Sequence, residues 1–211
     1  MGPDARALEA FIRQRMRVSS PPGLDELRLH LAGPTAGLQR FMGENAAEPY
    51  WAFAWGGGLA LARHILDHPE TVRGRRVLDL GAGSGLVAIA AMTAGAASAV
   101  AIDVDPNAAV AVRLNAALNH VAVEAVTGDL LDGPSPKGIS TVLVGDLFYE
   151  VALADRVLAF LRRCRAADVD VLIGDPGRRP LPVAALTSIG APPKADFGGA
   201  VTGGGVFRFP E

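Results

Sequence analysis

The sequence predicts an α/β domain built around a mostly parallel β-sheet with helices on both faces. Three observations support this fold class. Between residues 76 and 173, short segments rich in Val, Ile and Leu alternate with longer segments of helical pattern. The first of these apolar segments runs directly into a glycine-rich turn, which is typical of a strand followed at once by a helix. Strands separated by helices pair in parallel through right-handed crossovers, so a single sheet is expected.

The N-terminal part of the chain carries weaker signals. Residues 4–17 have the spacing of a short amphipathic helix. Residues 27–31 alternate apolar and polar side chains, as a half-buried strand does. Residues 45–58 are aromatic and glycine-rich, and we expect them to be irregular before a helix over residues 59–68.

The central elements follow one another closely. We expect core strands at residues 76–80, 97–103, 122–126, 139–145 and 169–173. The expected helices run from the glycine turn to about residue 94, from 106 to about 119, and from 151 to about 165. Pro106 opens the second of these helices because proline fits the first helical turn, and Asp105 is expected to cap it.

The end of the chain is expected to close the sheet. Residues 182–189 are predicted as a short helix, and residues 195–197 and 206–209 as two strands. A glycine-rich segment separates the two strands, which indicates an antiparallel hairpin. Since no repeat or linker divides the sequence, we expect one domain over residues 1–211, in which residues 1–58 form an N-terminal extension.

Composition argues against several classes of protein. Half of the residues are apolar and a fifth are charged, as in globular domains. No uninterrupted apolar stretch is long enough to span a bilayer, so no membrane contact is expected. The net charge of -2 argues against a broad nucleic-acid surface. The histidines have no metal-ligand spacing, so no metal is expected. The single cysteine, Cys164, fits a reducing compartment: the cytoplasm, or the mitochondrial matrix in a eukaryote.

The turn Gly81-Ala-Gly83-Ser-Gly85 joins the first core strand to its helix. A glycine turn at the carboxyl end of a parallel strand lets a ligand approach the backbone closely. The fingerprint of nicotinamide dinucleotide sites places its last small residue where this sequence has Leu86, which disfavours that ligand. Asp79, just before the turn, can attract an ammonium group or cap the turn, and the two roles are compatible.

Two more carboxylates follow the next strands. Asp103 ends the second strand, where a carboxylate can accept hydrogen bonds from both hydroxyls of a ribose. Asp129 comes just after the third strand, where it can accept from an adenine amino group. The alternative for Asp129 is an ordinary turn residue, which is the role we expect for Asp132.

In order and spacing, the turn, Asp103, Pro106 and Asp129 resemble the seven-strand methyltransferases that use S-adenosylmethionine (SAM), over roughly residues 50–211. The resemblance implies a Rossmann-like sheet of seven strands with a C-terminal antiparallel hairpin. It also implies that SAM is the cofactor and that S-adenosylhomocysteine is the product. It also implies a set of cofactor-binding residues: Asp79, Gly81, Gly83, Gly85, Asp103, Asp129 and, close to the glycines of the preceding segment, Trp55.

Two further segments narrow the resemblance to protein-lysine methyltransferases. Residues 49–60 precede the first core strand, and Asp146-Leu-Phe-Tyr149-Glu150 follows the fourth as an acidic-x-x-aromatic motif. Together with residues 21–31 and 174–178, these segments are similar to the lysine methyltransferases of the electron transfer flavoprotein β-subunit. The resemblance implies that this subunit is the protein substrate and partner.

The acidic motif carries the argument about the methyl acceptor. Methyltransferases of amide or base nitrogens usually have Asn-Pro-Pro-Tyr at this place, whereas a carboxylate suits an ammonium. Asp146 is therefore expected to bind and position the substrate lysine. Tyr149 is expected to line the lysine channel, and Glu150 is either a second carboxylate or an acid that favours the start of the next helix. Trp51 and Trp55 could lie against the cofactor; the alternative is that they form a hydrophobic plug between the N-terminal segment and the core.

Other functions stay open on the sequence alone. The acceptor could be another protein, such as a ribosomal protein, a small amine or a base, and Asp146 weighs against the base. A SAM-binding module without catalysis is a different class, which the intact acidic-x-x-aromatic motif disfavours. A nicotinamide oxidoreductase is disfavoured by Leu86.

Overall fold

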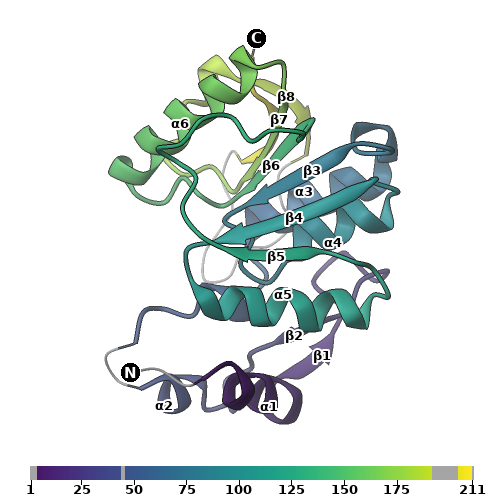
Figure 1. Ribbon diagram of the computed structural model, residues 1–211, viewed down its shortest axis with the longest axis vertical. Coiled ribbons are helices and arrows are strands. Elements are labelled where there is room, and N and C mark those ends of the chain that lie inside the picture. The colour runs from purple at the N-terminus through teal and green to yellow at the C-terminus, as the bar shows by residue number, and fades with distance from the viewer. Residues whose placement is uncertain (1–3, 44–45, 192–203, 211) are drawn as a thin grey trace.

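The computed structural model describes residues 4–43, 46–191 and 204–210 (Figure 1). Its main sheet has seven strands in the order β5-β4-β3-β6-β7-β9-β8. The first five in this order pair in parallel, whereas β9 pairs antiparallel with both β7 and β8. The α/β fold class with a closing antiparallel hairpin is thus confirmed. The strands are β3 (Arg76–Leu80), β4 (Ser98–Asp103), β5 (Glu124–Thr127), β6 (Thr141–Gly145), β7 (Asp170–Asp175), β8 (Thr187–Gly190) and β9 (Gly205–Arg208).

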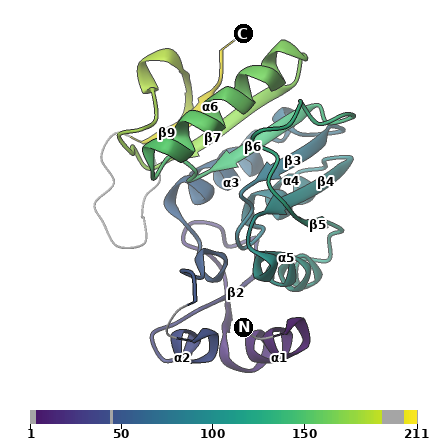
Figure 2. The same ribbon diagram turned by 60° about the vertical axis from the view of Figure 1, so that its left-hand side comes forward.

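Helices cover both faces of this sheet, which explains why most residues of its central strands are apolar and buried. Alternate residues point to opposite faces: Val77 and Leu143 pack with α3 and α4, whereas Leu78 and Val142 pack against α6. Figure 2 shows α6 alone on its face of the sheet. The fully buried Cys164 belongs to this α6 layer. The helices are α3 (Gly56–Asp67), α4 (Leu86–Thr93), α5 (Pro106–Leu118) and α6 (Val151–Ala166), with the short η2 (Pro69–Thr71) after α3.

Helix α3 begins at Gly56, earlier than the expected start at residue 59. The reason is a close approach between α3 and β7. A Cβ atom added to Gly57 would overlap the carbonyl oxygen of Gly174, and one added to Gly174 would overlap the carbonyl oxygen of Gly57. Glycine has a poor helix propensity, which made this segment look irregular, but only glycine allows the two backbones to lie so close.

The N-terminal residues pack on α5 and form no separate core. Leu8 and Ile12 of α1 join a buried cluster with Trp51 and with Val110 and Leu114 of α5. Figures 1 and 2 both show α1, β1 and β2 on the outer side of α5. The expected helix and strand are confirmed, although β1 was not foreseen. The elements are α1 (Ala5–Arg15), β1 (Arg17–Ser19), β2 (Leu29–Leu31), α2 (Leu38–Met42) and η1 (Tyr50–Ala52).

Asn115 on α5 connects this N-terminal region to the glycine turn. Its Oδ1 accepts a hydrogen bond from the backbone of His30 in β2, at 2.8 Å. Its Nδ2 donates to the carbonyl oxygen of Ser84 in the turn, at 2.9 Å. One fully buried amide therefore fixes the position of both segments.

The C-terminal prediction was partly wrong. Residues 182–189 do not form a helix: a single turn, η3 (Val183–Ala185), leads into strand β8. Pairing with β9 along the sheet edge outweighs the local helical pattern. The predicted strand at 206–209 is confirmed as β9, while the predicted strand at 195–197 lies outside the described residues.

Within the described ranges, none of the helices combines the length and apolar character needed to span a lipid bilayer.

Candidate functional site

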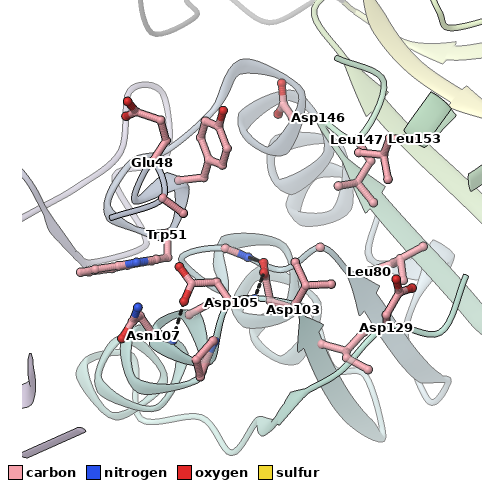
Figure 3. Close-up of a pocket in the computed structure, with 18 of the residues that line it drawn as sticks. Glu48, Trp51, Leu80, Asp103, Asp105, Asn107, Asp129, Asp146, Leu147 and Leu153 are labelled. Carbon is pink, nitrogen blue, oxygen red and sulfur yellow. Dashed lines mark hydrogen bonds between the residues drawn. The ribbon is translucent and has the colours of Figure 1, made fainter. Parts of the chain in front are cut away.

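A cavity of about 1140 Å³ opens at the carboxyl ends of the parallel strands (Figure 3). Strand ends β3, β4 and β6 and the segment after β5 form one side, and residues between Met42 and Trp55 form another. Its volume is slightly above the range of about 300–1,000 Å³ that is typical of ligand sites. Of the sequence-predicted site residues, seven line this cavity: Trp55, Gly81, Gly83, Asp103, Asp129, Asp146 and Tyr149.

The glycine turn uses a backbone conformation that favours glycine. Gly81, Gly83 and Gly85 have φ angles of 68°, 51° and 80°. The amides of Gly81 and Ala82 donate to the carbonyl oxygen of Ile102, which holds the turn against β4. Gly81 and Gly83 face the cavity, whereas Gly85 is the residue before α4 and is not part of the cavity wall. The left-handed backbone at position 85, rather than contact with a ligand, therefore explains why this residue is glycine.

Asp79 is buried beneath the turn and is not part of the cavity wall. Its Oδ2 accepts a hydrogen bond from Ala88 in the first turn of α4, at 2.9 Å. Burial raises the pKa of this carboxyl group from 3.8 to about 7, although the hydrogen bond opposes the rise. Of the two roles expected for Asp79, capping is the one that its hydrogen bond supports.

Asp103 lines the cavity and also holds the glycine turn in place through a hydrogen bond. Its Oδ2 accepts from the amide of Gly83 at 2.8 Å, and its Oδ1 accepts from the amide of Asp105 at 2.9 Å. Burial raises the pKa of Asp103, and these two amides oppose the rise. Each oxygen has a further lone pair, so the carboxylate can still accept from a ligand. Asp105 caps α5, as expected, because its Oδ1 accepts a hydrogen bond from the backbone amide of Asn107.

Asp129 has the turn role that the sequence offered, and it also lines the cavity. Its Oδ1 accepts from the amide of Leu131 at 2.9 Å, as a turn aspartate does. Its Oδ2 binds Arg156 of α6 at 2.9 Å, and Arg156 also binds Asp132. The Leu131 amide and the Arg156 guanidinium lower the pKa of Asp129. Sequence reasoning missed Arg156, because nothing in the sequence shows that α6 passes beside this loop.

Asp146 lies on the opposite side of the cavity from Asp129, next to the start of α3. It is one of the few non-glycine residues with a left-handed backbone, at φ 59°. Its Oδ2 accepts from the amide of Gly58 at 2.7 Å, at the positive end of the α3 dipole. Its Oδ1 accepts from Nη1 of Arg178, which also lines the cavity.

The segment that carries Arg178 is held by a buried carboxylate. It follows β7, which ends in Asp175, a fully buried residue. Oδ1 of Asp175 accepts from the amides of Gly177 and Arg178, at 2.7 and 2.6 Å. Its Oδ2 lies 3.8 Å from Arg178 Nη1 and has no hydrogen-bond partner among the described residues. Burial raises the pKa of Asp175 to about 6.

Aromatic side chains form part of the cavity wall. Tyr50 lies between Tyr149 and Trp55, with ring centroids 5.9 and 5.6 Å away. Trp55 Nε1 donates to the carbonyl oxygen of Tyr50, at 2.9 Å. Trp51 also lines the cavity but is buried in the cluster on α5, so it is part of the hydrophobic plug as well.

Glu150 is not part of the cavity wall. It is exposed and occupies the position before the first residue of α6. This position supports the second role considered for it, an acid that favours the start of a helix. Among the described residues, no group of three or more His, Cys, Asp or Glu side chains is placed to hold a metal ion.

The fold and the cavity define a seven-strand methyltransferase of Rossmann-like architecture, and comparison with known proteins agrees. Residues 60–159 match the family model described as ribosomal protein L11 methyltransferase (PrmA). A Xenopus laevis protein named electron transfer flavoprotein beta subunit lysine methyltransferase is 44% identical over 172 residues, which cover 80% of this chain and 70% of that protein. The chain belongs to the family of electron transfer flavoprotein β-subunit lysine methyltransferases.

Relatives with the same name come from distant organisms. The Homo sapiens protein is 40% identical over 179 residues, which cover 81% of this chain and 67% of the human protein. A Caenorhabditis elegans homologue is 31% identical over 197 residues, which cover 85% of this chain and 80% of the nematode protein.

Proposed function

We propose that this chain transfers the methyl group of SAM to lysine side chains of the electron transfer flavoprotein β-subunit. The observation that carries the proposal is a single cavity with two chemically different sides. Gly83, Asp103 and Asp129 line it together with Asp146 and Tyr149, and Asp146 lies across the cavity from Asp129 (Figure 3). The names of the relatives support the choice of protein substrate.

The first side fits the parts of SAM. The positive φ angles of Gly81 and Gly83 favour glycine, and at Gly83 no atom lies nearer than 3.8 Å to the place of a Cβ, so a ligand can lie against the backbone there. Asp103 retains lone pairs for the ribose hydroxyls, and Asp129 can accept from the adenine amino group. Trp55 and Trp51 supply apolar surface beside them. When bound, SAM supplies a methyl group on a sulfonium, and S-adenosylhomocysteine is the product.

The second side fits an amine that approaches this cofactor. A free lysine has a pKa of about 10.4 and is mostly protonated at neutral pH. Asp146 is anchored by Gly58, so its carboxylate can hold the arriving ammonium in one place. Since a nearby carboxylate raises the pKa of an amine, Asp146 positions the substrate and does not promote its deprotonation. Holding reacting groups in place contributes up to roughly 7–11 kcal/mol in ideal cases.

The test is transfer from labelled SAM to the purified flavoprotein, read by mass spectrometry of its β-subunit. We expect lysine methylation of that subunit and none of ribosomal protein L11 or of RNA. Asp146→Asn keeps an oxygen for the Gly58 amide, so SAM affinity should stay nearly constant while transfer falls by about tenfold or more. Loss of SAM binding in this variant would move Asp146 to the cofactor side, and absence of lysine methylation by the native protein would refute the proposal.

A further inference from the structure

The carboxylate that is proposed to bind the substrate ammonium already holds a cation of the protein itself. Arg178 donates to Oδ1 of Asp146, and both side chains line the cavity. Their side chains are only 22% and 11% exposed, so water screens this pair weakly. An incoming lysine therefore meets an Asp146 whose charge is largely compensated.

A second carboxylate is placed to take the arginine. Oδ2 of Asp175 lies 3.8 Å from Nη1 of Arg178, just beyond hydrogen-bond distance. This oxygen is buried and has no hydrogen-bond partner among the described residues. A buried acceptor without a partner is costly, so a short movement of the guanidinium toward Asp175 would satisfy it.

The backbone around Asp175 can stay fixed during that movement. Oδ1 of Asp175 accepts from the amides of Gly177 and Arg178, which holds the start of the Arg178 loop on β7. Only the arginine side chain then has to move, and its long stem allows this. Oδ2 is left for the guanidinium.

We propose that Arg178 closes the lysine site in the absence of substrate, and that the substrate ammonium displaces it from Asp146 onto Oδ2 of Asp175. Before the exchange Asp146 and Asp175 share the one guanidinium, and after it each carboxylate has a cation of its own, so the number of buried charges without a partner does not rise. Asp175 acts as a positioning residue, because it never touches the substrate. This inference rests on the proposed lysine acceptor.

Two substitutions and their combination test the exchange. Asp175→Asn keeps an oxygen for the Gly177 and Arg178 amides but removes the charge that receives the guanidinium. We expect its KM for the flavoprotein to rise by about tenfold or more, with kcat at saturating substrate and the SAM Kd changed by less than about twofold. Arg178→Gln removes the competitor, so its KM should be lower than that of the native protein.

The double variant separates exchange from a structural role. With no guanidinium to receive, Asp175→Asn should have no further effect, so Asp175→Asn/Arg178→Gln should have the low KM of Arg178→Gln. A structural role of Asp175 would instead give additive effects. Arg179→Gln, an exposed neighbour outside the cavity wall, is the matched control and should behave as the native protein.

Each outcome decides the matter. An unchanged or raised KM in Arg178→Gln overturns the exchange, even if Asp175→Asn does not fold. A fall in kcat at constant KM in that variant would show that the arginine works from a fixed position. If the native protein methylates no lysine, the proposed function and the exchange fail together. If it does methylate lysine and the two KM values do not move, only the exchange fails.

Discussion

At the scale of single residues, the strand-end carboxylates are held in place by the protein before any ligand arrives. Asp79, Asp103 and Asp146 each accept at least one hydrogen bond from a backbone amide at the start of a helix or in the glycine turn. Backbone donors cannot rotate away as side chains do. The orientation of each carboxylate therefore follows from the fold, which lowers the entropy cost of binding.

Asp103→Ala should weaken SAM binding by about 1.5–3 kcal/mol, because it removes charge-assisted hydrogen bonds to the ribose. It also removes the acceptor for the Gly83 amide, which lies in the same wall. Isothermal titration measures the change. Asp25→Ala, an exposed acid outside the cavity wall, is the control. An affinity equal to that of the native protein would rule out the ribose assignment.

Asp79→Asn should change how stability depends on pH. The folded protein holds the Asp79 proton up to about pH 7, whereas an unperturbed carboxyl group releases it near 3.8. Folding therefore takes up a proton between these values, and stability falls as the pH rises through this window. Asparagine keeps an acceptor for the Ala88 amide without the charge.

Urea unfolding of the SAM-free protein at about pH 5 and about pH 8 provides the measurement. The variant should gain stability relative to the native protein at the higher pH and gain less at the lower pH. The difference between the two proteins isolates Asp79 from Asp175, whose raised pKa acts in the same direction. An equal difference at both pH values would show that the buried carboxyl group does not titrate in this window.

At the scale of elements, the contact between α3 and β7 positions the part of the cavity wall that contains Asp146. Because Gly57 and Gly174 meet backbone to backbone, the first turn of α3 reaches Asp146. Gly57→Ala would gain about 1 kcal/mol of helix propensity. Its Cβ would lie 2.8 Å from Asp146 Oδ2 and would overlap the carbonyl oxygen of Gly174, so separation of the two elements should outweigh that gain.

We expect Gly57→Ala to lower the free energy of unfolding by about 1–3 kcal/mol, as overpacked cores do. Denaturant unfolding measures it. Gly33→Ala is the matched control, since no atom lies within 4 Å of its added Cβ. If Gly57→Ala were as stable as the control, the close approach would not be the reason for the glycines.

At the scale of the whole molecule, the cavity is shared between the sheet and the N-terminal segment. Tyr50, Trp51 and Trp55 line it together with the strand ends, while Trp51 also packs with α5. Binding that contacts both parts should stabilise them as a unit.

Hydrogen exchange with and without SAM can detect this coupling. We expect slower exchange in residues 50–55 and 81–83, because both segments line the cavity. Strands β8 and β9, at the far edge of the sheet, should change little. Protection of residues 81–83 alone would mean that the N-terminal segment does not cover the cofactor.

The sequence predicted the parallel core well because its signals are local. Most core strands are largely apolar runs, and Pro106 with Asp105 marks the start of α5. The edge of the sheet was predicted less well, since β8 depends on pairing with β9, a partner distant in sequence. The early start of α3 was missed for a similar reason: Gly57 is required by its close approach to Gly174 of β7, which is distant in sequence.

The site shows the same division. Residues at strand ends could be placed from the order of the elements, because parallel strands bring their carboxyl ends to one edge. Arg156 and Arg178 could not be placed, because each reaches its aspartate from an element distant in the sequence. Asp79, Gly85 and Glu150 match the motifs but do not line the cavity. Asp79 accepts a hydrogen bond from the first turn of α4, Gly85 is the residue before α4, and Glu150 is the residue before α6.

Cys164 has a practical consequence for following this molecule in solution. It is the only thiol in the chain, it is fully buried in α6, and burial raises its pKa. A thiol reagent needs both access and thiolate, so it reacts when α6 leaves the sheet. The rate of labelling therefore measures the opening of the fold in the native sequence. Comparing the labelling rate with and without SAM or the flavoprotein shows how much each one slows this opening, and no engineered probe is needed.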